Sequence, residues 1–460
     1  MGMDIQETSV PFDLDRKLTP REIAQTIEYC RHDVESTIDV WLQKKNEFDA
    51  HMALLNLFEL PLKYISKTQA QLASIILKAQ RRSYDDEWEI RLPETLELKK
   101  YKYVADWFLN PVNHNTSKNL KCEIMSVPHV IAWGGLHGAV DMYHHKCEKG
   151  HVFVMADVDQ LYPTIMVKYG LLSRSVTIPE RFENILATSL RLKAEKKKKE
   201  REPYKRICNI VYGAEGDKNN NMYDPLHRTL VCVFGQLLVI MLLEMLEERM
   251  EYIELIQSNT DGILVKIKDT DFDLFDDIVF EWEQKTHLHM SFDFYRSIHQ
   301  KDVNNYIAIG EDGSVKSKGA YVKSLSDLDY DLPIVNKAII EYFVNGVYPD
   351  ETITSCQNLR DFQKIVKVSS KYLCGWHNGE YLTDKTFRVF ASKDQSDTFI
   401  GKMKNAGATV EKFANTPNHC FIDNGDVTEK HPPENLDLMW YIDLAWKRLE
   451  QFGVSTQYEF

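Results

Sequence analysis

Three short segments in a fixed order constrain the fold of this 460-residue chain more than any other feature. They are Asp157–Pro163, Lys205–Gly213 and Asn259–Gly262. The first and the third each place a carboxylate, Asp157 and Asp261, next to a run of apolar residues typical of a buried strand. The second segment is typical of a helix with a basic face. We therefore expect two strand ends and one helix face to share a site.

The residues around these segments alternate between strand and helix patterns. The predicted elements are a strand over 151–158, a helix over 160–169, a helical hairpin over 181–200 and 202–215 that breaks near Pro203, a long helix over 226–250, and strands over 252–257 and 263–268. Aspartate followed by glycine between the last two strands predicts a hairpin turn at Asp261-Gly262.

Helical patterns also occupy both ends of the chain. Thr19–Glu22 is a capping box that starts a helix, and a second helical region covers 69–82. Apolar residues recur with a helical period after the capping box, at Ile23, Ile27, Cys30, Val34, Ile38 and Trp41. From about residue 325 the pattern is again helical but irregular. Four cations there are spaced to share one helix face, namely Arg360, Lys364, Lys367 and Lys371.

Charge is distributed unevenly along the chain. The net charge of −13 argues by itself against nucleic-acid binding. Residues 181–205, however, contain nine basic and four acidic side chains. A solvated helix face is the usual explanation for a run such as Lys196–Lys199. Its position just before the second segment favours a functional role.

Two compositional features bear on the compartment. The longest uncharged stretch, over 229–243, is shorter than the ~20 residues that a membrane helix needs, so we expect a buried core helix and no membrane partner. Eight cysteines are scattered over the chain, which favours free thiols in a reducing compartment such as the cytoplasm.

The two carboxylates suit phosphoryl transfer. That chemistry uses two divalent ions roughly 3.5–4 Å apart, which clamp the attacking and leaving oxygens. Mg²⁺ prefers oxygen ligands, and Asp157 and Asp261 could supply them from two different strands. Two simpler explanations stay open: Asp261-Gly262 as an ordinary turn, and Asp157 as a helix N-cap.

Lys205, Asn209 and Tyr212 fall on one face of the predicted helix because they are spaced four and three residues apart. A cation, an amide and an aromatic ring suit a triphosphate and a base, and lysine is a good point charge for phosphate oxygens. An amphipathic helix with a polar edge is the simpler explanation.

Together the three segments resemble motifs A, B and C of the family B DNA polymerases, most closely the bacteriophage type. The resemblance implies an α+β right-hand polymerase with an antiparallel palm sheet, helical fingers and a thumb. This sequence departs from the usual motifs at three positions: Gln160 and Ile210 replace serines, and Asn259 replaces the first aspartate of motif C. Asp261 is then the single motif C carboxylate, and Asp159 is an additional one.

The resemblance also implies roles for individual residues. Asp157 and Asp261 would hold two Mg²⁺ ions, for which Mn²⁺ can substitute, with the Val158 carbonyl as a third ligand. Tyr162 would stack beneath the deoxyribose and exclude a 2′-hydroxyl. The remaining nucleotide contacts would come from Lys205 and Arg191 to the triphosphate, with Lys193 and Lys197 as competitors of Arg191, and from Asn209 and Tyr212 to the nascent base pair.

Further expected DNA contacts lie outside the nucleotide site. Gly213 would let the template strand approach closely. Gly134 and Gly135 belong to a segment, Ala132–His137, that resembles the template-contacting Tyr-x-Gly-Gly element. Two weaker matches to later primer-binding elements are Tyr306 and Lys318.

Tyr29 and Asp33 resemble the third exonuclease motif, Tyr-x-x-x-Asp, whose partner motifs would lie much further upstream than the chain reaches. The implied division is an exonuclease remnant (1–50), a connecting region (51–120), palm with motif A (121–180), fingers with motif B (181–222), palm with motif C (223–324) and thumb (325–460).

The expected function is template-directed addition of dNMPs to a primer 3′ end. The expected partners are primer-template DNA, dNTPs, an upstream exonuclease subunit and a processivity factor, in the host-cell cytoplasm if the protein is phage-encoded. The alternative is a non-catalytic DNA-binding subunit that kept the polymerase fold.

Overall fold

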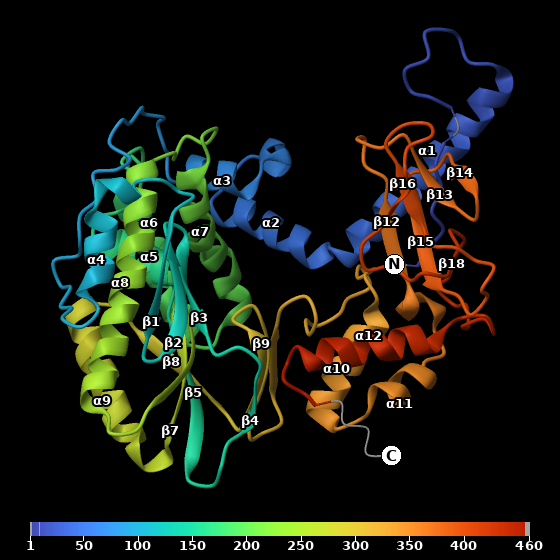
Figure 1. Cartoon of the computed structure of the whole chain (residues 1–460). Helices are drawn as coiled ribbons and strands as arrows, with labels where there is room; N and C mark the ends of the chain where they lie inside the picture. Colours follow the sequence, from blue (N-terminus) through green and yellow to red (C-terminus); the bar gives the residue numbers. More distant parts are fainter. Residues whose placement is uncertain (1, 9, 456–460) are drawn as a thin grey trace. The chain divides into compact units, whose positions relative to one another are not determined.

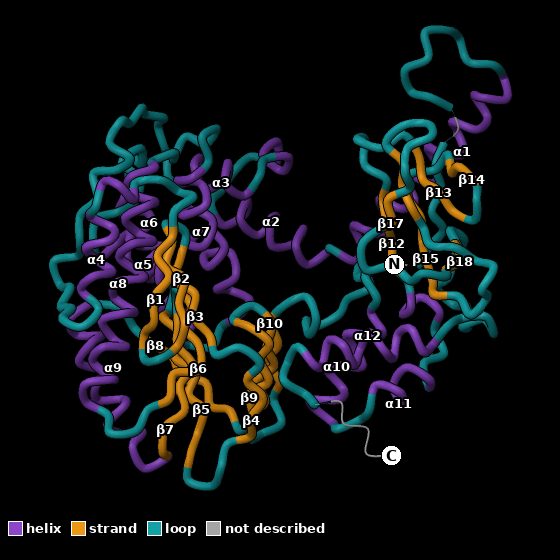
Figure 2. Tube along the Cα trace, in the orientation of Figure 1, coloured by secondary structure: helices purple, strands orange, loops and turns teal. Residues whose placement is uncertain are grey.

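The chain forms two compact units in this computed structural model, which describes residues 2–8 and 10–455 (Figures 1 and 2). The larger unit comprises Asn46–Val303 and Ala308–Ser314. The smaller unit comprises Met1–Lys45, Asn304–Ile307 and Val315–Phe460. Both units mix helices with antiparallel sheets, which confirms the expected α+β class.

The larger unit is built on a seven-stranded sheet in the order β1-β2-β3-β6-β7-β5-β8, in which every neighbouring pair is antiparallel. Its strands are β1 (Asn119–Ile124), β2 (Val127–Ala132), β3 (Gly135–Ala139), β5 (His151–Val158), β6 (Glu254–Asn259), β7 (Gly262–Lys268) and β8 (Met290–Tyr295). The predicted strands before and after the third segment are confirmed as β6 and β7, and the strand over 151–158 as β5. A separate antiparallel pair joins β4 (Tyr143–Lys146) to β9 (Ser297–Asp302).

Helices of the larger unit carry the residues between these strands. They are α2 (Lys45–Leu57), α3 (Gln69–Ile76), α4 (Lys102–Leu109), α5 (Leu161–Lys168), α6 (Pro179–Ala194), α7 (Lys198–Gly216), α8 (Pro225–Arg249) and α9 (Phe272–Thr286), with short 3₁₀ turns at Leu62–Ser66, Pro111–Asn113 and Asp269–Asp271. The helix predicted over 69–82 ends earlier, at Ile76, because Lys78 turns into the left-handed region with φ 50°.

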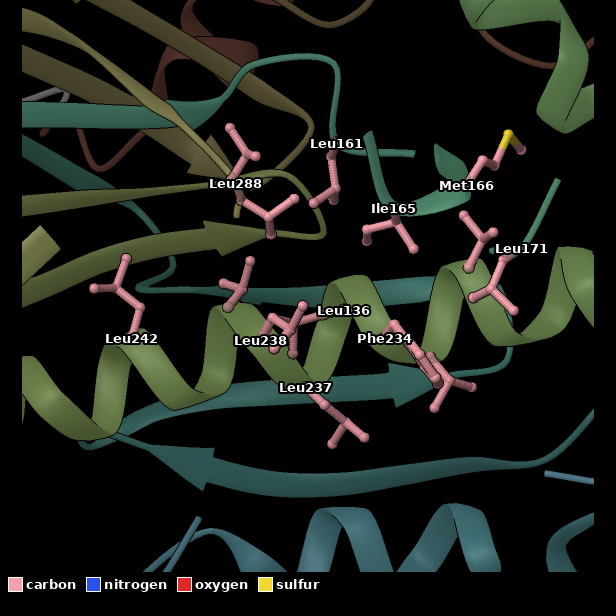
Figure 3. Packing of buried hydrophobic residues seen from close by; sticks show 14 of the residues in the cluster. Leu136, Leu161, Ile165, Met166, Leu171, Phe234, Leu237, Leu238, Leu242 and Leu288 are labelled. Carbon is pink, nitrogen blue, oxygen red and sulfur yellow. The ribbon is translucent and has the colours of Figure 1, made fainter. Parts of the chain in front are cut away.

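Helix α8 forms the centre of the hydrophobic core. Side chains from α5, α8 and β3 pack together there, among them Ile165, Leu238 and Leu136 (Figure 3). Burial of each such leucine contributes about 1.5–3 kcal/mol. Within the described residues α8 is the one helix long and apolar enough to cross a membrane. Of its apolar stretch, 89% is buried inside the protein. The prediction of a buried core helix is therefore confirmed.

The helical hairpin of α6 and α7 breaks at a different place from the one expected. Helix α6 ends at Ala194, and Lys196 adopts a left-handed conformation with φ 57° before α7 begins. Pro203 lies inside α7 rather than at the break. Proline removes one backbone donor there, and this single loss does not end the helix.

The smaller unit contains α1 (Pro20–Gln43), α10 (Pro333–Asn345), α11 (Pro349–Thr354), α12 (Leu438–Glu450) and a 3₁₀ turn at Leu359–Phe362. One sheet has the order β12-β15-β18, and another β14-β13-β16-β17. Its strands are β12 (Lys364–Lys367), β13 (Cys374–His377), β14 (Glu380–Leu382), β15 (Thr386–Ala391), β16 (Gly401–Met403), β17 (Glu411–Lys412) and β18 (Cys420–Ile422). The chain passes between the units in β10 (Asn305–Ile309), and β11 (Val315–Lys318) follows.

The basic helix face expected over 360–371 does not exist. The residues form a 3₁₀ turn followed by β12, so side chains three apart point to opposite faces of the strand. Arg360 pairs with Asp327 at 2.7 Å, and Lys364 pairs with Asp331 at 2.7 Å. The helical spacing of these cations was therefore coincidental.

The first residues of the chain are held by its last third. The Ile5 amide donates to the Asn424 carbonyl at 2.7 Å, and the Val427 amide donates to the Gly2 carbonyl at 2.7 Å. The Arg388 guanidinium, which is buried, donates to the Met3 carbonyl. These hydrogen bonds tie the N-terminal segment to the sheet that contains β15 and β18.

Helix α1 starts at the predicted capping box, in which Thr19 and Glu22 bond each other's backbone amides. None of its residues is buried. The apolar residues that recur along it are exposed, including Ile27 at 59% and Val34 at 60%. The sequence periodicity thus predicted the helix correctly, while its apolar face lies in solvent.

Candidate active site

The three sequence segments meet in one cleft of the larger unit, with a volume of 610 Å³. The first segment contributes the end of β5 and the start of α5, the second contributes one face of α7, and the third contributes the turn between β6 and β7. These elements are up to about a hundred residues apart in sequence. Their convergence is the arrangement that the sequence predicts.

The register between β5 and β7 brings the two carboxylates to the same end of the sheet. Asp157 lies opposite Gly262, and the Val158 amide donates to the Asp261 carbonyl at 2.7 Å. A Cβ atom on Gly262 would lie 2.3 Å from Asp157 Oδ1 and 2.8 Å from the Ala156 carbonyl. Only glycine therefore allows this approach of the Asp157 side chain to β7.

Two simpler explanations of these aspartates can be compared with the structure. The hairpin closes at Asn259 opposite Gly262, so Thr260 and Asp261 form the turn and Gly262 begins β7. The expected Asp-Gly turn is therefore shifted by one residue. The N-cap of α5 is Gln160, not Asp157. Both aspartates line the cleft, which leaves their side chains in place to bind a ligand.

The donor set fits a hard divalent cation through oxygen atoms. Asp157 and Asp261 provide carboxylates, and Val158 also lines the cleft. Asn259, which stands where motif C usually has its first aspartate, is not among the residues that line the cleft. In the described part of the chain no group of three or more His, Cys, Asp or Glu side chains is arranged to hold a metal. A metal would therefore depend on two carboxylates and backbone or water oxygens.

Asp159 also lines the cleft, but its carboxylate has protein partners there. Its side chain is 10% exposed and forms an ion pair with Lys193 of α6. The Ser291 hydroxyl also donates to Asp159 Oδ1, at 3.0 Å. The additional carboxylate is thus paired with a lysine and a serine in this structure.

Two tyrosines form one wall of the cleft. The ring centroids of Tyr162 and Tyr212 are 4.2 Å apart, and both rings line the cleft. Burial raises the pKa of both hydroxyls, so both stay protonated at neutral pH. The Arg228 guanidinium carbon lies 5.3 Å from the centroid of the Tyr212 ring, and this cation–π contact restrains the ring.

Lys205 and Asn209 line the cleft and are exposed within it, as the helical spacing predicts. Arg201, one turn before Lys205 on the same face of α7, lines it as well. Its Nε atom is buried and has no hydrogen-bond partner among the described residues. Sequence reasoning missed Arg201, although its position four residues before Lys205 is the signal that could have identified it.

The three basic side chains that the sequence left unranked have different partners in the structure. Arg191 is not among the residues that line the cleft, and it pairs with Glu195 at 2.9 Å. Lys197 pairs with the same glutamate. Lys193 lines the cleft, where it holds Asp159. The geometry therefore favours Lys193 and Arg201 over Arg191 as neighbours of a bound anion.

The remaining predicted residues lie outside this cleft lining. A Cβ on Gly134 or on Gly213 would meet no atom within 4 Å. A Cβ on Gly135 would lie 2.6 Å from the Thr260 hydroxyl oxygen. Tyr306 is buried and Lys318 is exposed, both in the smaller unit.

Tyr29 and Asp33 lie on α1, in the smaller unit. The pKa of Tyr29 is raised by partial burial and by the charge and hydrogen bond of Asp33, so the two side chains interact with each other. This contact is the one that the spacing of four residues on a helix predicts.

Comparison with known proteins finds similarity to solved structures. No protein-family model matches the sequence, and no curated protein matches it. The fold is similar to the structure of the family B DNA polymerase from the hyperthermophilic archaeon Pyrobaculum calidifontis, with a TM-score of 0.49 and 13% sequence identity. The similarity covers 96% of this chain and 58% of that chain.

Proposed function

We propose that this chain is the polymerase core of a bacteriophage-type family B DNA polymerase, which extends a primer 3′ end under the direction of a template. One observation carries the proposal: Asp157, Asp261, Tyr162 and Lys205, from three distant segments, line a single cleft. The sequence of each segment resembles a polymerase motif, and the cleft assembles them as a nucleotidyl-transfer site requires.

The acidic end of the cleft is the proposed metal site. Asp157 and Asp261, with the Val158 carbonyl, would hold two Mg²⁺ ions, for which Mn²⁺ can substitute. When bound, these ions neutralise charge on the transferred phosphate and align the attacking and leaving oxygens. Gly262 maintains the approach of Asp157 to β7 on which this donor set depends.

The basic end of the cleft is the proposed triphosphate site. Lys205 and Arg201 project from one face of α7. Arginine presents a planar fork of donors that matches phosphate oxygens, whereas lysine acts as a compact point charge. Lys193 would join them when a triphosphate competes with Asp159 for its ammonium group.

The tyrosine wall is the proposed sugar and base site. Tyr162 would lie beneath the deoxyribose and exclude a 2′-hydroxyl, while Tyr212 and Asn209 face the nascent base pair. Template contacts are assigned to Gly134, Gly135 and Gly213.

Outside the cleft, Tyr306 and Lys318 are assigned to the primer. Tyr29 and Asp33 would complete an exonuclease site with an upstream chain, and a processivity factor is the second proposed protein partner. The division into palm, fingers and thumb belongs to the same proposal, as does a cytoplasmic location.

Primer extension with dNTPs and Mg²⁺ tests the proposal. Asp157→Ala or Asp261→Ala should lower the extension rate by about 10³-fold or more, because each removes several kcal/mol of charge stabilisation. Primer-template affinity should change little. Asp276→Ala, which removes an exposed carboxylate from α9, is the matched control and should extend normally.

The second candidate function is a non-catalytic DNA-binding subunit. It is favoured because the third segment supplies a single carboxylate, Asp261, to the cleft. Asn259, which stands where motif C usually has its first aspartate, lies outside the cleft lining. The same assay separates the two functions: wild-type protein that binds primer-template but adds no nucleotide supports the subunit and refutes the polymerase.

A further inference from the structure

A buried cysteine outside the three segments contacts the tyrosine wall of the cleft. Cys232, on α8, has no exposed surface. Its Sγ atom lies 3.6 Å from the Tyr162 hydroxyl. The Tyr212 hydroxyl lies near the same thiol and interacts with it electrostatically. The sulfur atom therefore contacts Tyr162 directly, and Tyr162 packs against Tyr212.

The thiol of Cys232 is protonated at neutral pH. Burial raises the pKa of Cys232, so the group stays a neutral S–H. A neutral thiol can both donate and accept a weak hydrogen bond. It can thus bond the Tyr162 hydroxyl, whose own pKa is raised by burial.

Gln236, one helical turn further along α8, forms hydrogen bonds with the cysteine. Its Nε2 donates to Cys232 Sγ at 3.4 Å and to the Cys232 carbonyl at 3.2 Å. The same nitrogen donates to the Ala132 carbonyl at 3.0 Å, at the end of β2. Two backbone oxygens face this nitrogen, so they fix the orientation of the amide.

The amide of Gln236 is costly to bury in this orientation. The side chain has no exposed surface, and its Oε1 has no hydrogen-bond partner among the described residues. An unsatisfied buried polar atom costs about 1–3 kcal/mol. An apolar residue of similar size would avoid that cost, so the Nε2 contacts are what the glutamine contributes.

We propose that Cys232 and Gln236 are positioning residues that fix the Tyr162 ring at the depth in the cleft that sets sugar discrimination. The inference rests on the proposed function, in which Tyr162 lies beneath the deoxyribose. Without the thiol, the hydroxyl end of Tyr162 loses its anchor and the ring can move away from the sugar. The space gained accommodates a 2′-hydroxyl, so a ribonucleotide is accepted more readily.

The test is the ratio of kcat/KM for a dNTP to kcat/KM for the matching rNTP in primer extension. In Cys232→Ala and in Gln236→Met this ratio should fall about 10-fold, which corresponds to about 1.4 kcal/mol of discrimination. Cys232→Ser, which restores a donor and acceptor, should recover most of the ratio. A loss of general structure would lower both rates together and leave the ratio unchanged.

Two controls make the outcome decisive. Cys208→Ala removes a second fully buried thiol, which lines the same cleft from α7, and should leave the ratio at the wild-type value. Tyr162→Ala should lower the ratio at least as far as Cys232→Ala. Thermal melting of each variant confirms that it is folded.

The results distinguish this inference from the proposed function. If Tyr162→Ala lowers the ratio while Cys232→Ala and Gln236→Met keep the wild-type value, the positioning role is overturned and the polymerase stands. An equal fall in Cys208→Ala also overturns it. If wild-type protein adds no nucleotide, or Tyr162→Ala leaves the ratio unchanged, the proposed function or its sugar site fails, and the inference fails with it.

Discussion

Replacing Gly262 with alanine should displace Asp157 from the cleft. The added Cβ would lie 2.3 Å from Asp157 Oδ1, 2.8 Å from the Ala156 carbonyl and 3.2 Å from Asp157 Cα. Two of these three atoms belong to the backbone of β5, which is paired on both sides by β7 and β8. The carboxylate is therefore the group that can yield, and the strands can separate only at a cost.

The size of the effect follows from these distances. Ordinary van der Waals contact begins near 3.4 Å, so the Asp157 oxygen has to move by about 1 Å, a misplacement that can cost about 100-fold in rate. Overpacking between two central strands should also lower the free energy of unfolding by about 1–3 kcal/mol. We therefore expect a folded protein with a lower melting temperature and about 100-fold slower extension.

Two measurements separate the local effect from general damage. Mn²⁺ binding, followed by the loss of the free-ion paramagnetic resonance signal, should weaken at least 10-fold in Gly262→Ala. Gly213→Ala adds the same methyl group to open space on α7 and should bind Mn²⁺ as wild type does. Wild-type Mn²⁺ affinity and extension rate in Gly262→Ala would refute the argument that this glycine holds Asp157 in place.

Two further predictions each concern one ionisable side chain. Glu215 is fully buried, and burial raises its pKa well above the usual value of 4.5. Above pH 4.5 the folded state therefore keeps a proton that the unfolded state releases. The free energy of unfolding is highest below pH 4.5 and declines as the pH rises toward the folded pKa. Glu215→Gln keeps the acceptor for the Ser173 amide, so its melting temperature should exceed that of wild type at pH 8 and converge with it near pH 4; equal pH dependence of the two proteins would contradict the protonated state. Arg201→Gln should raise the KM for dNTPs about 10-fold, as expected for loss of one charge-assisted hydrogen bond. Arg191→Gln should leave KM unchanged, and the opposite ranking of the two variants in steady-state extension would restore the sequence-based choice of Arg191.

The elements that carry the cleft were predictable because local patterns determine them. Apolar runs gave the strands that carry Asp157 and flank Asp261, and the spacing of Lys205, Asn209 and Tyr212 gave their common helix face. The exact turn was less predictable: a one-residue shift makes Thr260 and Asp261 the turn, since strand pairing across the whole hairpin sets where it closes.

Features that depend on long-range contacts were not predictable. The left-handed turn at Lys196 has no sequence signal, because lysine has no preference for that conformation. The cations at Arg360 and Lys364 have helical spacing, but carboxylates more than thirty residues away hold them.

The candidate site shows the same limit. The choice between Arg191 and Arg201 depends on how each helix is rotated toward the cleft, and Cys232 contributes from a helix that none of the three segments contains. Such choices require the tertiary structure.

The discontinuous smaller unit has a consequence for biosynthesis. Residues 2–7 are synthesised well before their partners at 385–427, which emerge only after the larger unit has been made. The larger unit is nearly continuous and can fold while translation proceeds. Residues 2–7 cannot form these contacts until residue 427 has been synthesised. Completion of the smaller unit should therefore be the late, slow step of folding, because its contacts join residues that lie far apart in the sequence.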